Sequence, residues 1–79
     1  MTHVYILQSL ADGSYYVGVT DDVDKRLFEH NNKSSRYTSS KAPFELIWHC
    51  VFKDKTKALQ FERYLKSGSG FAFRNKRLI

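Results

Sequence analysis

The chain has 79 residues, 42% of them hydrophobic, and carries a formal net charge of +5. This length predicts one small domain, residues 1–79, and the hydrophobic content excludes an intrinsically disordered chain. An excess of Lys and Arg on a small domain favours an anionic partner, most often nucleic acid, although charge alone is equally compatible with a solvated basic surface.

The single cysteine, Cys50, excludes an internal disulfide framework and a cysteine zinc cluster. Its apolar surroundings indicate a small buried side chain. The N-terminus has no basic-then-apolar signal segment, and no apolar run approaches the roughly 18 residues that a membrane helix needs. We therefore expect no membrane association and a reducing, cytoplasmic location.

The first predicted element is a β-hairpin. Residues 3–9 alternate as a strand does, residues 14–20 are rich in Tyr and Val, and Asp12-Gly13 between them predicts a two-residue turn. That turn pairs residue 5 with 20, 7 with 18, and 9 with 16. Four residues then share one face of the hairpin: Tyr5, Leu7, Tyr16 and Gly18. A strand glycine indicates either the close approach of a ligand or another backbone, or a bulge.

A helix is predicted from Thr20-Asp21-Asp22, which supplies capping and acidic groups, to about residue 31. Its inward stripe, at the i, i+3, i+4, i+7 spacing, is Val23, Arg26, Leu27 and His30. Two of the four are ionisable, and an inward charge needs a partner or a cleft. Two simpler interpretations stay open: an ion pair of Arg26 with Asp22 or Glu29, and a helix C-terminal cation at His30.

Residues 31–43 predict a polar loop that Pro43 closes. Such a loop can contact phosphates and stack a base, or it can be a merely solvated surface. The residues that suit the first interpretation are Lys33, Arg36, Tyr37 and Lys41.

Residues 44–52 predict a strand that is apolar on both sides, which indicates a sheet lying between helices. A second helix is predicted over residues 55–66, capped by Asp54 or Thr56. Glu62 falls inside its apolar stripe, where a carboxylate is costly unless it meets a cation, a metal or several donors. An ion pair between Glu62 and Arg26, with no metal, is the alternative. Residues 67–70 are expected to break this helix, and residues 71–79 to form a short last one.

Together these polar residues suit metal-assisted phosphodiester hydrolysis. Glu62 would bind one divalent cation, Mg²⁺ or Mn²⁺, with several retained waters, and the cation would polarise the phosphate. Arg26 would hold the non-bridging oxygens and offset charge in the transition state. A phenol titrates near a pKa of about 10, so Tyr5 would act as a base only with help from neighbouring cations or His30.

The ordered motifs resemble the GIY-YIG endonuclease family. Val4-Tyr5-Ile6 resembles its first triplet and Tyr16-Val17-Gly18 its second, with the two tyrosines eleven residues apart. The resemblance continues through nearly the whole chain, at Gly18-Val19-Thr20, Lys25-Arg26-Leu27, Glu29-His30-Asn31, Arg36-Tyr37-Thr38, Glu62 and Leu65-Lys66-Ser67. The most similar branch is the small stand-alone group that resembles the nuclease domain of the UvrC repair excinuclease.

This resemblance implies an α+β fold with a three-stranded antiparallel sheet, first strand central, flanked by helices. It also implies a DNA endonuclease, structure-dependent or weakly sequence-specific, with a role in DNA repair or recombination. Tyr5 would be the general base or water positioner, Tyr16 its partner near the metal, and His30 an aid to proton transfer. The implied active-site residues are Tyr5, Tyr16, Arg26, His30 and Glu62. Asn75 is the only candidate for a late asparagine that many members place near the phosphate.

The residues expected to contact nucleic acid are Gly18, Lys33, Arg36, Tyr37, Lys41, Lys66 and Arg74. Affinity and sequence choice would come from a protein partner, a homodimer or a special DNA shape. One alternative is a nucleic-acid-binding module or partner subunit with little nuclease activity of its own. Another is a metal-free structural domain in which Glu62 pairs with Arg26.

Overall fold

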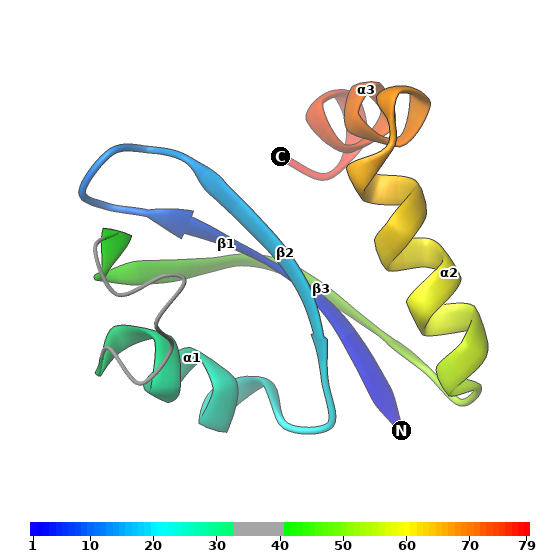
Figure 1. Ribbon diagram of the computed structural model, residues 1–79, viewed down its shortest axis with the longest axis horizontal. Coiled ribbons are helices and arrows are strands. Elements are labelled where there is room, and N and C mark those ends of the chain that lie inside the picture. Colours follow the sequence, from blue (N-terminus) through cyan, green and yellow to red (C-terminus); the bar gives the residue numbers. More distant parts are fainter. Residues whose placement is uncertain (33–40) are drawn as a thin grey trace.

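The computed structural model describes residues 1–32 and 41–79. In chain order its elements are β1 (Thr2–Ser9), β2 (Tyr15–Thr20), α1 (Val23–Asn31), β3 (Phe44–Phe52), α2 (Lys55–Lys66) and α3 (Gly68–Arg77). The strands form one antiparallel sheet in the order β2-β1-β3, so the first strand is central. Helix α1 covers one face of the sheet, α2 covers the other, and α3 turns back beside the end of α2 (Figure 1). The predicted α+β fold is confirmed.

Alternate residues of β1 pack into two different clusters, one on each face of the sheet. On the α2 side, Val4 and Ile6 pack with Ala58 and Leu65. On the α1 side, the second cluster consists of Tyr5, Leu7 and Phe44. Tyr16 and Leu27 pack against this cluster. The period of two in the sequence therefore assigns each side chain of β1 to the correct face.

The hairpin loop is longer than predicted. The backbone N–H of Ser9 donates to the carbonyl of Ser14, so four residues, 10–13, form the loop. Tyr5 pairs with Gly18 and residue 7 with residue 16, which shows that the predicted pairs were wrong by two positions. An even shift keeps every side chain on its face, so Tyr5, Tyr16 and Gly18 still share one, as predicted.

Side chains inside the loop explain its length. The Ser9 hydroxyl oxygen accepts hydrogen bonds from the N–H groups of Ala11 and Asp12, at 3.1 and 3.2 Å. Asp12 Oδ1 accepts from the hydroxyl and the N–H of Ser14, at 2.6 and 2.9 Å. These bonds, above all the one from the Ser14 hydroxyl, lower the pKa of Asp12 to about 2. They stabilise a loop in which Gly13 alone has a positive φ, of 78°.

β3 has the predicted bounds but contains a bulge. Ile47 is the extra residue between the partners of Ile6 and Leu7. After the bulge, residues 48, 50 and 52 pack on the α2 side, whereas Leu46 packs on the α1 side. Leu46 therefore does not share a face with residues 48, 50 and 52, because a bulge re-aims the side chains that follow it.

Side-chain caps mark where the helices begin. Asp22 caps α1 through the N–H of Lys25, and Asp54, one of the two predicted caps, begins α2. Ser67 caps α3 by accepting a hydrogen bond from the Gly70 N–H at 3.3 Å. Residues 68–70, predicted to be a break, are therefore the first turn of α3. No helix within the described ranges has the length and apolar character needed to span a membrane.

Candidate active site

Tyr5 and His30 form the buried centre of a polar cluster on the α1 face. Tyr5 is 2% exposed and His30 is fully buried. The Tyr5 hydroxyl lies 3.3 Å from His30 Nε2. The Tyr16 ring meets the imidazole edge-on, with ring centroids 5.0 Å apart, and lies 6.3 Å from the Tyr5 ring. The structure thus brings both tyrosines and the histidine together on one face.

Gly18 leaves the space that Tyr5 occupies. A Cβ atom at position 18 would lie 2.5 Å from the Tyr5 hydroxyl oxygen and 3.1 Å from a ring carbon of Tyr16. The β1–β2 ladder runs through Gly18 without a register shift, so the bulge interpretation is wrong. The close approach that a strand glycine indicates is made by the side chain of Tyr5 on the neighbouring strand. Direct contact of Gly18 with nucleic acid stays a prediction.

Arg26 supplies the positive charge beside the phenols. Its Nη1 lies 3.5 Å from Glu29 Oε1, and its side chain is 33% exposed. One of the two ion pairs considered for Arg26 is therefore present. A side-chain hydrogen bond with Tyr5 is the main reason that the pKa of Arg26 is raised, and one with Tyr16 adds to it. The guanidinium thus acts on the Tyr5 phenol and is itself partly open to solvent.

Burial decides the protonation states at this centre. Burial raises the pKa of the Tyr5 phenol, the hydrogen bond from Arg26 opposes the rise, and the charges of Tyr16 and Glu62 add to it. Burial, and then the positive charge of Arg26, lower the pKa of His30. At neutral pH the phenol is protonated and the imidazole is neutral. The lowered pKa and the complete burial of His30 disfavour its interpretation as a helix C-terminal cation.

Glu62 lies on α2, the helix that packs on the sheet face opposite to Tyr5 and Tyr16. Its side chain is 18% exposed, and its Oε2 accepts a hydrogen bond from Lys66 Nζ at 2.9 Å. Among residues 1–32 and 41–79, Glu62 makes no ion pair with Arg26, so that alternative is wrong. The negative charge of Glu62 makes the smallest of the named contributions to the raised pKa of Tyr5.

The donor set at Glu62 fits a hard divalent cation held by few protein ligands. Within the described part of the chain, no three His, Cys, Asp or Glu side chains are grouped so that they could hold a metal. Mg²⁺ needs only one or two carboxylates when waters and substrate phosphates complete its shell, and the single Glu62 matches that chemistry. Lys66, now bonded to Glu62, would have to release it.

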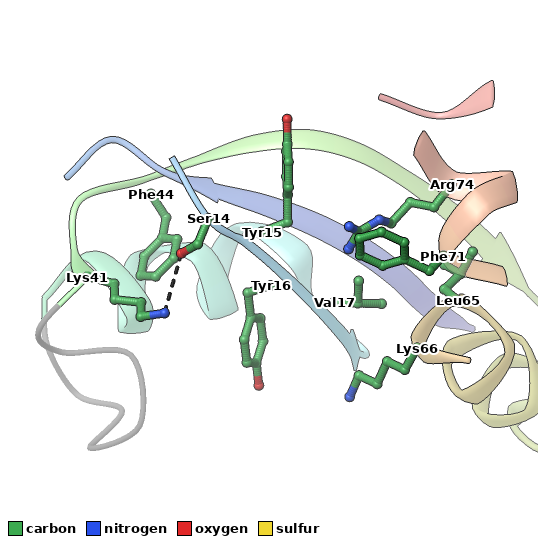
Figure 2. Close-up of a pocket in the computed structure, with 10 residues that line it drawn as sticks. All are labelled: Ser14, Tyr15, Tyr16, Val17, Lys41, Phe44, Leu65, Lys66, Phe71 and Arg74. Carbon is green, nitrogen blue, oxygen red and sulfur yellow. Dashed lines mark hydrogen bonds between the residues drawn. The ribbon is translucent and has the colours of Figure 1, made fainter. Parts of the chain in front are cut away.

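A groove of about 480 Å³ runs along the outer edge of β2, beside this cluster (Figure 2). Its lining includes three of the cations expected to contact nucleic acid, Lys41, Lys66 and Arg74. Three other expected contacts, Lys33, Arg36 and Tyr37, lie outside the described residues.

Two aromatic residues of the groove, Tyr15 and Phe71, were not identified from the sequence as site residues. Tyr15 and Phe71 flank Arg74, with their ring centroids 5.2 and 4.4 Å from its guanidinium carbon. A signal for one of them was present, because Phe71 stands three residues before Arg74 in a helical segment. Nothing in the sequence indicated that Tyr15 lies beside that segment.

A three-stranded sheet between helices, with two tyrosines, an arginine and a histidine gathered on one face, defines a nuclease domain of the GIY-YIG type. The GIY-YIG catalytic domain matches residues 1–76, and the chain belongs to this family. The family consists of endonuclease-type catalytic domains.

Among similar proteins are UPF0213 proteins of Bacillus pumilus and Lacticaseibacillus paracasei. Each is 41% identical over 66 residues, which covers 82% of this chain and 67% or 74% of the relative, respectively. A solution NMR structure of the UPF0213 protein BH0048 from Bacillus halodurans has 34% identity and a TM-score of 0.58. That match covers 99% of this chain and 87% of the other.

Proposed function

We propose that the protein is a metal-dependent endonuclease that hydrolyses phosphodiester bonds in DNA. The observation that carries the proposal is the convergence of Tyr5, Arg26 and His30 on one sheet face. Membership of an endonuclease family supports the reaction class.

The Tyr5–His30 contact offers a path for a proton. The neutral imidazole can accept the phenolic proton at Nε2, over the observed 3.3 Å, while the hydrogen bond from Arg26 stabilises the phenolate that remains. Tyr5 then takes a proton from the attacking water or holds that water in position. Tyr16, which packs against His30, is proposed to orient the same water.

Arg26 and Glu62 are proposed to act on the phosphate. The partly exposed guanidinium of Arg26 suits the non-bridging oxygens and offsets charge that develops in the transition state. Glu62 would hold Mg²⁺ or Mn²⁺, which, when bound, polarises the phosphate and stabilises the leaving oxygen. We further propose a structure-dependent or weakly sequence-specific substrate, a role in DNA repair or recombination in the cytoplasm, and a protein partner or homodimer that adds specificity.

The test is cleavage of labelled nicked, branched, single-stranded and duplex DNA in Mg²⁺ or Mn²⁺. Glu62→Gln keeps the shape of the side chain and removes its charge, and should slow cleavage by about 100-fold or more. Glu45→Gln, at an exposed carboxylate on β3, is the matched control and should cleave as the wild type does. Equal rates for the wild type and Glu62→Gln, or cleavage that persists in EDTA, would contradict the proposal.

A second candidate function is nucleic-acid binding with little intrinsic cleavage. The groove with Lys41, Lys66 and Arg74 favours it, since these cations need no metal to bind phosphate. Binding that weakens steeply with salt, without cleavage of any DNA in the panel, would support this candidate over hydrolysis. The third interpretation, a metal-free domain, had depended on a Glu62–Arg26 pair, whereas Glu62 is bonded to Lys66.

A further inference from the structure

The β2-edge groove connects the two faces of the sheet. Tyr15 and Tyr16, neighbours on β2, point to opposite sides of the strand, and both line the groove (Figure 2). At one end lie Phe71 and Arg74 of α3, and toward the other lies Lys41. Because β2 is the edge strand of the sheet, its outer edge faces this groove rather than another described strand.

Arg74 is a buried cation without an acidic partner in the described part of the chain. It is 7% exposed, and its Nε donates to Asn75 Oδ1 at 3.3 Å. No described carboxylate lies within ion-pair distance of its guanidinium, and Arg74 lines the groove. A desolvated charge is costly unless an anion meets it. The groove therefore presents a prepared site for an anionic group.

The rings beside this cation remain largely accessible. Tyr15 is 40% exposed and Phe71 is 51% exposed, although both contact Arg74. Aromatic side chains stack on bases of single strands, and each such stack contributes substantially to affinity. A base within a duplex is already stacked on its neighbours, and only an unpaired or flipped base can meet a protein ring.

We propose that this groove binds an unpaired stretch of a nucleic-acid strand, with a phosphate on Arg74 and a base against Tyr15 and Phe71. The inference rests on the proposed function and deepens it, because it makes a single-stranded segment beside the cleaved bond part of the substrate. Asn75 acts here by fixing the Arg74 guanidinium through its Nε, rather than by touching the scissile phosphate.

The groove leads directly to the proposed catalytic residues. Tyr16 lines the groove and also packs against His30. Lys66 lines the groove and also binds Glu62, at 2.9 Å. A nucleic-acid strand that starts at Arg74 and follows the edge of β2 therefore passes Tyr16, which packs against His30, and Lys66, which binds Glu62. Lys66 and Lys41 are available to its phosphates.

Binding in EDTA tests this inference apart from catalysis. Three labelled DNAs of one sequence are compared by anisotropy: a single strand, a blunt duplex, and a duplex with an unpaired flap. Tyr15→Leu and Phe71→Leu should each weaken single-strand and flap binding about tenfold and leave duplex binding unchanged. A 2-aminopurine base in the unpaired segment should change fluorescence on binding to the wild type, and less on binding to either variant.

Two controls match these variants. Phe28→Leu removes an aromatic ring that is 66% exposed on α1, away from the groove, and should bind all three DNAs as the wild type does. Arg74→Gln should weaken single-strand binding, whereas Arg77→Gln, an exposed cation on the same helix, should not. Circular dichroism verifies that each variant is folded. If Arg74→Gln unfolds, Tyr15→Leu and Phe71→Leu still test the inference, because both replace exposed side chains.

Unchanged single-strand binding by Tyr15→Leu and Phe71→Leu would overturn the inference, as would equal weakening for single strand and duplex. Either result leaves the proposed endonuclease intact if the wild type still cleaves DNA in Glu62-dependent fashion. Conversely, selective loss of single-strand binding without cleavage of any substrate would support the groove and contradict the proposed hydrolysis.

Discussion

At His30, burial and the charge of Arg26 act in the same direction on the pKa, and both favour the neutral ring. The unfolded chain, with an ordinary pKa of 6.5, takes up a proton more readily than the folded protein. The free energy of unfolding should therefore fall as the pH drops from about 6.5 toward the lower folded pKa. Urea unfolding between roughly pH 8 and pH 5 measures this slope.

His30→Gln is the comparison that isolates this residue, because acidic groups also titrate as the pH falls. The variant should be less stable at neutral pH but lose less of its stability between pH 7 and pH 5 than the wild type does. Parallel pH profiles for the two proteins would show that His30 is not held neutral by the fold.

At Gly18, a single added methyl group meets the buried Tyr5 hydroxyl. Gly18→Ala should lower the free energy of unfolding by about 1–3 kcal/mol, because Tyr5 is 2% exposed and has little room to move. Urea unfolding checks the value. Gly68→Ala is the matched control, since its new Cβ would meet nothing within 4 Å, and its effect should stay within about 1 kcal/mol. Similar losses for both variants would contradict this packing argument.

Among the elements, those with strong local signals were predicted well. β3 and α2 begin and end as predicted, because an apolar run and a capped helical stripe depend mainly on neighbouring residues. The length of the loop after Ser9 was not predicted correctly, because side-chain hydrogen bonds set this length and compete with a two-residue turn at Asp12-Gly13. The bulge at Ile47 also has no local signal, because it arises from pairing with a distant strand.

α3 depends on a contact that only a glycine allows. A Cβ atom at Gly70 would overlap the carbonyl of Tyr64 at the end of α2. Gly70→Ala should therefore displace α3, lower the free energy of unfolding by about 1–3 kcal/mol, and speed amide exchange in α3 more than in β1. Ser69→Ala, at the exposed neighbouring position, should leave exchange in α3 unchanged. Unaltered exchange in Gly70→Ala would show that the helix accommodates the methyl group.

For the whole molecule, the sequence predicted the tyrosine cluster but not the groove. Periodicity alone places Tyr5 and Tyr16 on one face and turns Arg26 inward, since each position follows from its own element. The groove requires that α3 return to the edge of β2, and that arrangement is decided by packing at the end of α2. Glu62 pairs with Lys66 rather than with Arg26, because Lys66 stands four residues after Glu62 on the same helix and their side chains are neighbours there.

The distribution of charge over the molecule should determine how salt affects binding. The net charge of +5 predicts affinity for DNA that falls as salt rises from roughly 50 to 200 mM, because bound phosphates release counterions. If phosphates occupy the groove, Arg74→Gln should reduce the slope of log affinity against log salt by about one. Lys57→Gln, in the first turn of α2 and at the end away from α3, should leave the slope unchanged. Equal slopes for both variants would mean that the DNA is held by diffuse charge over the surface rather than by contacts in the groove.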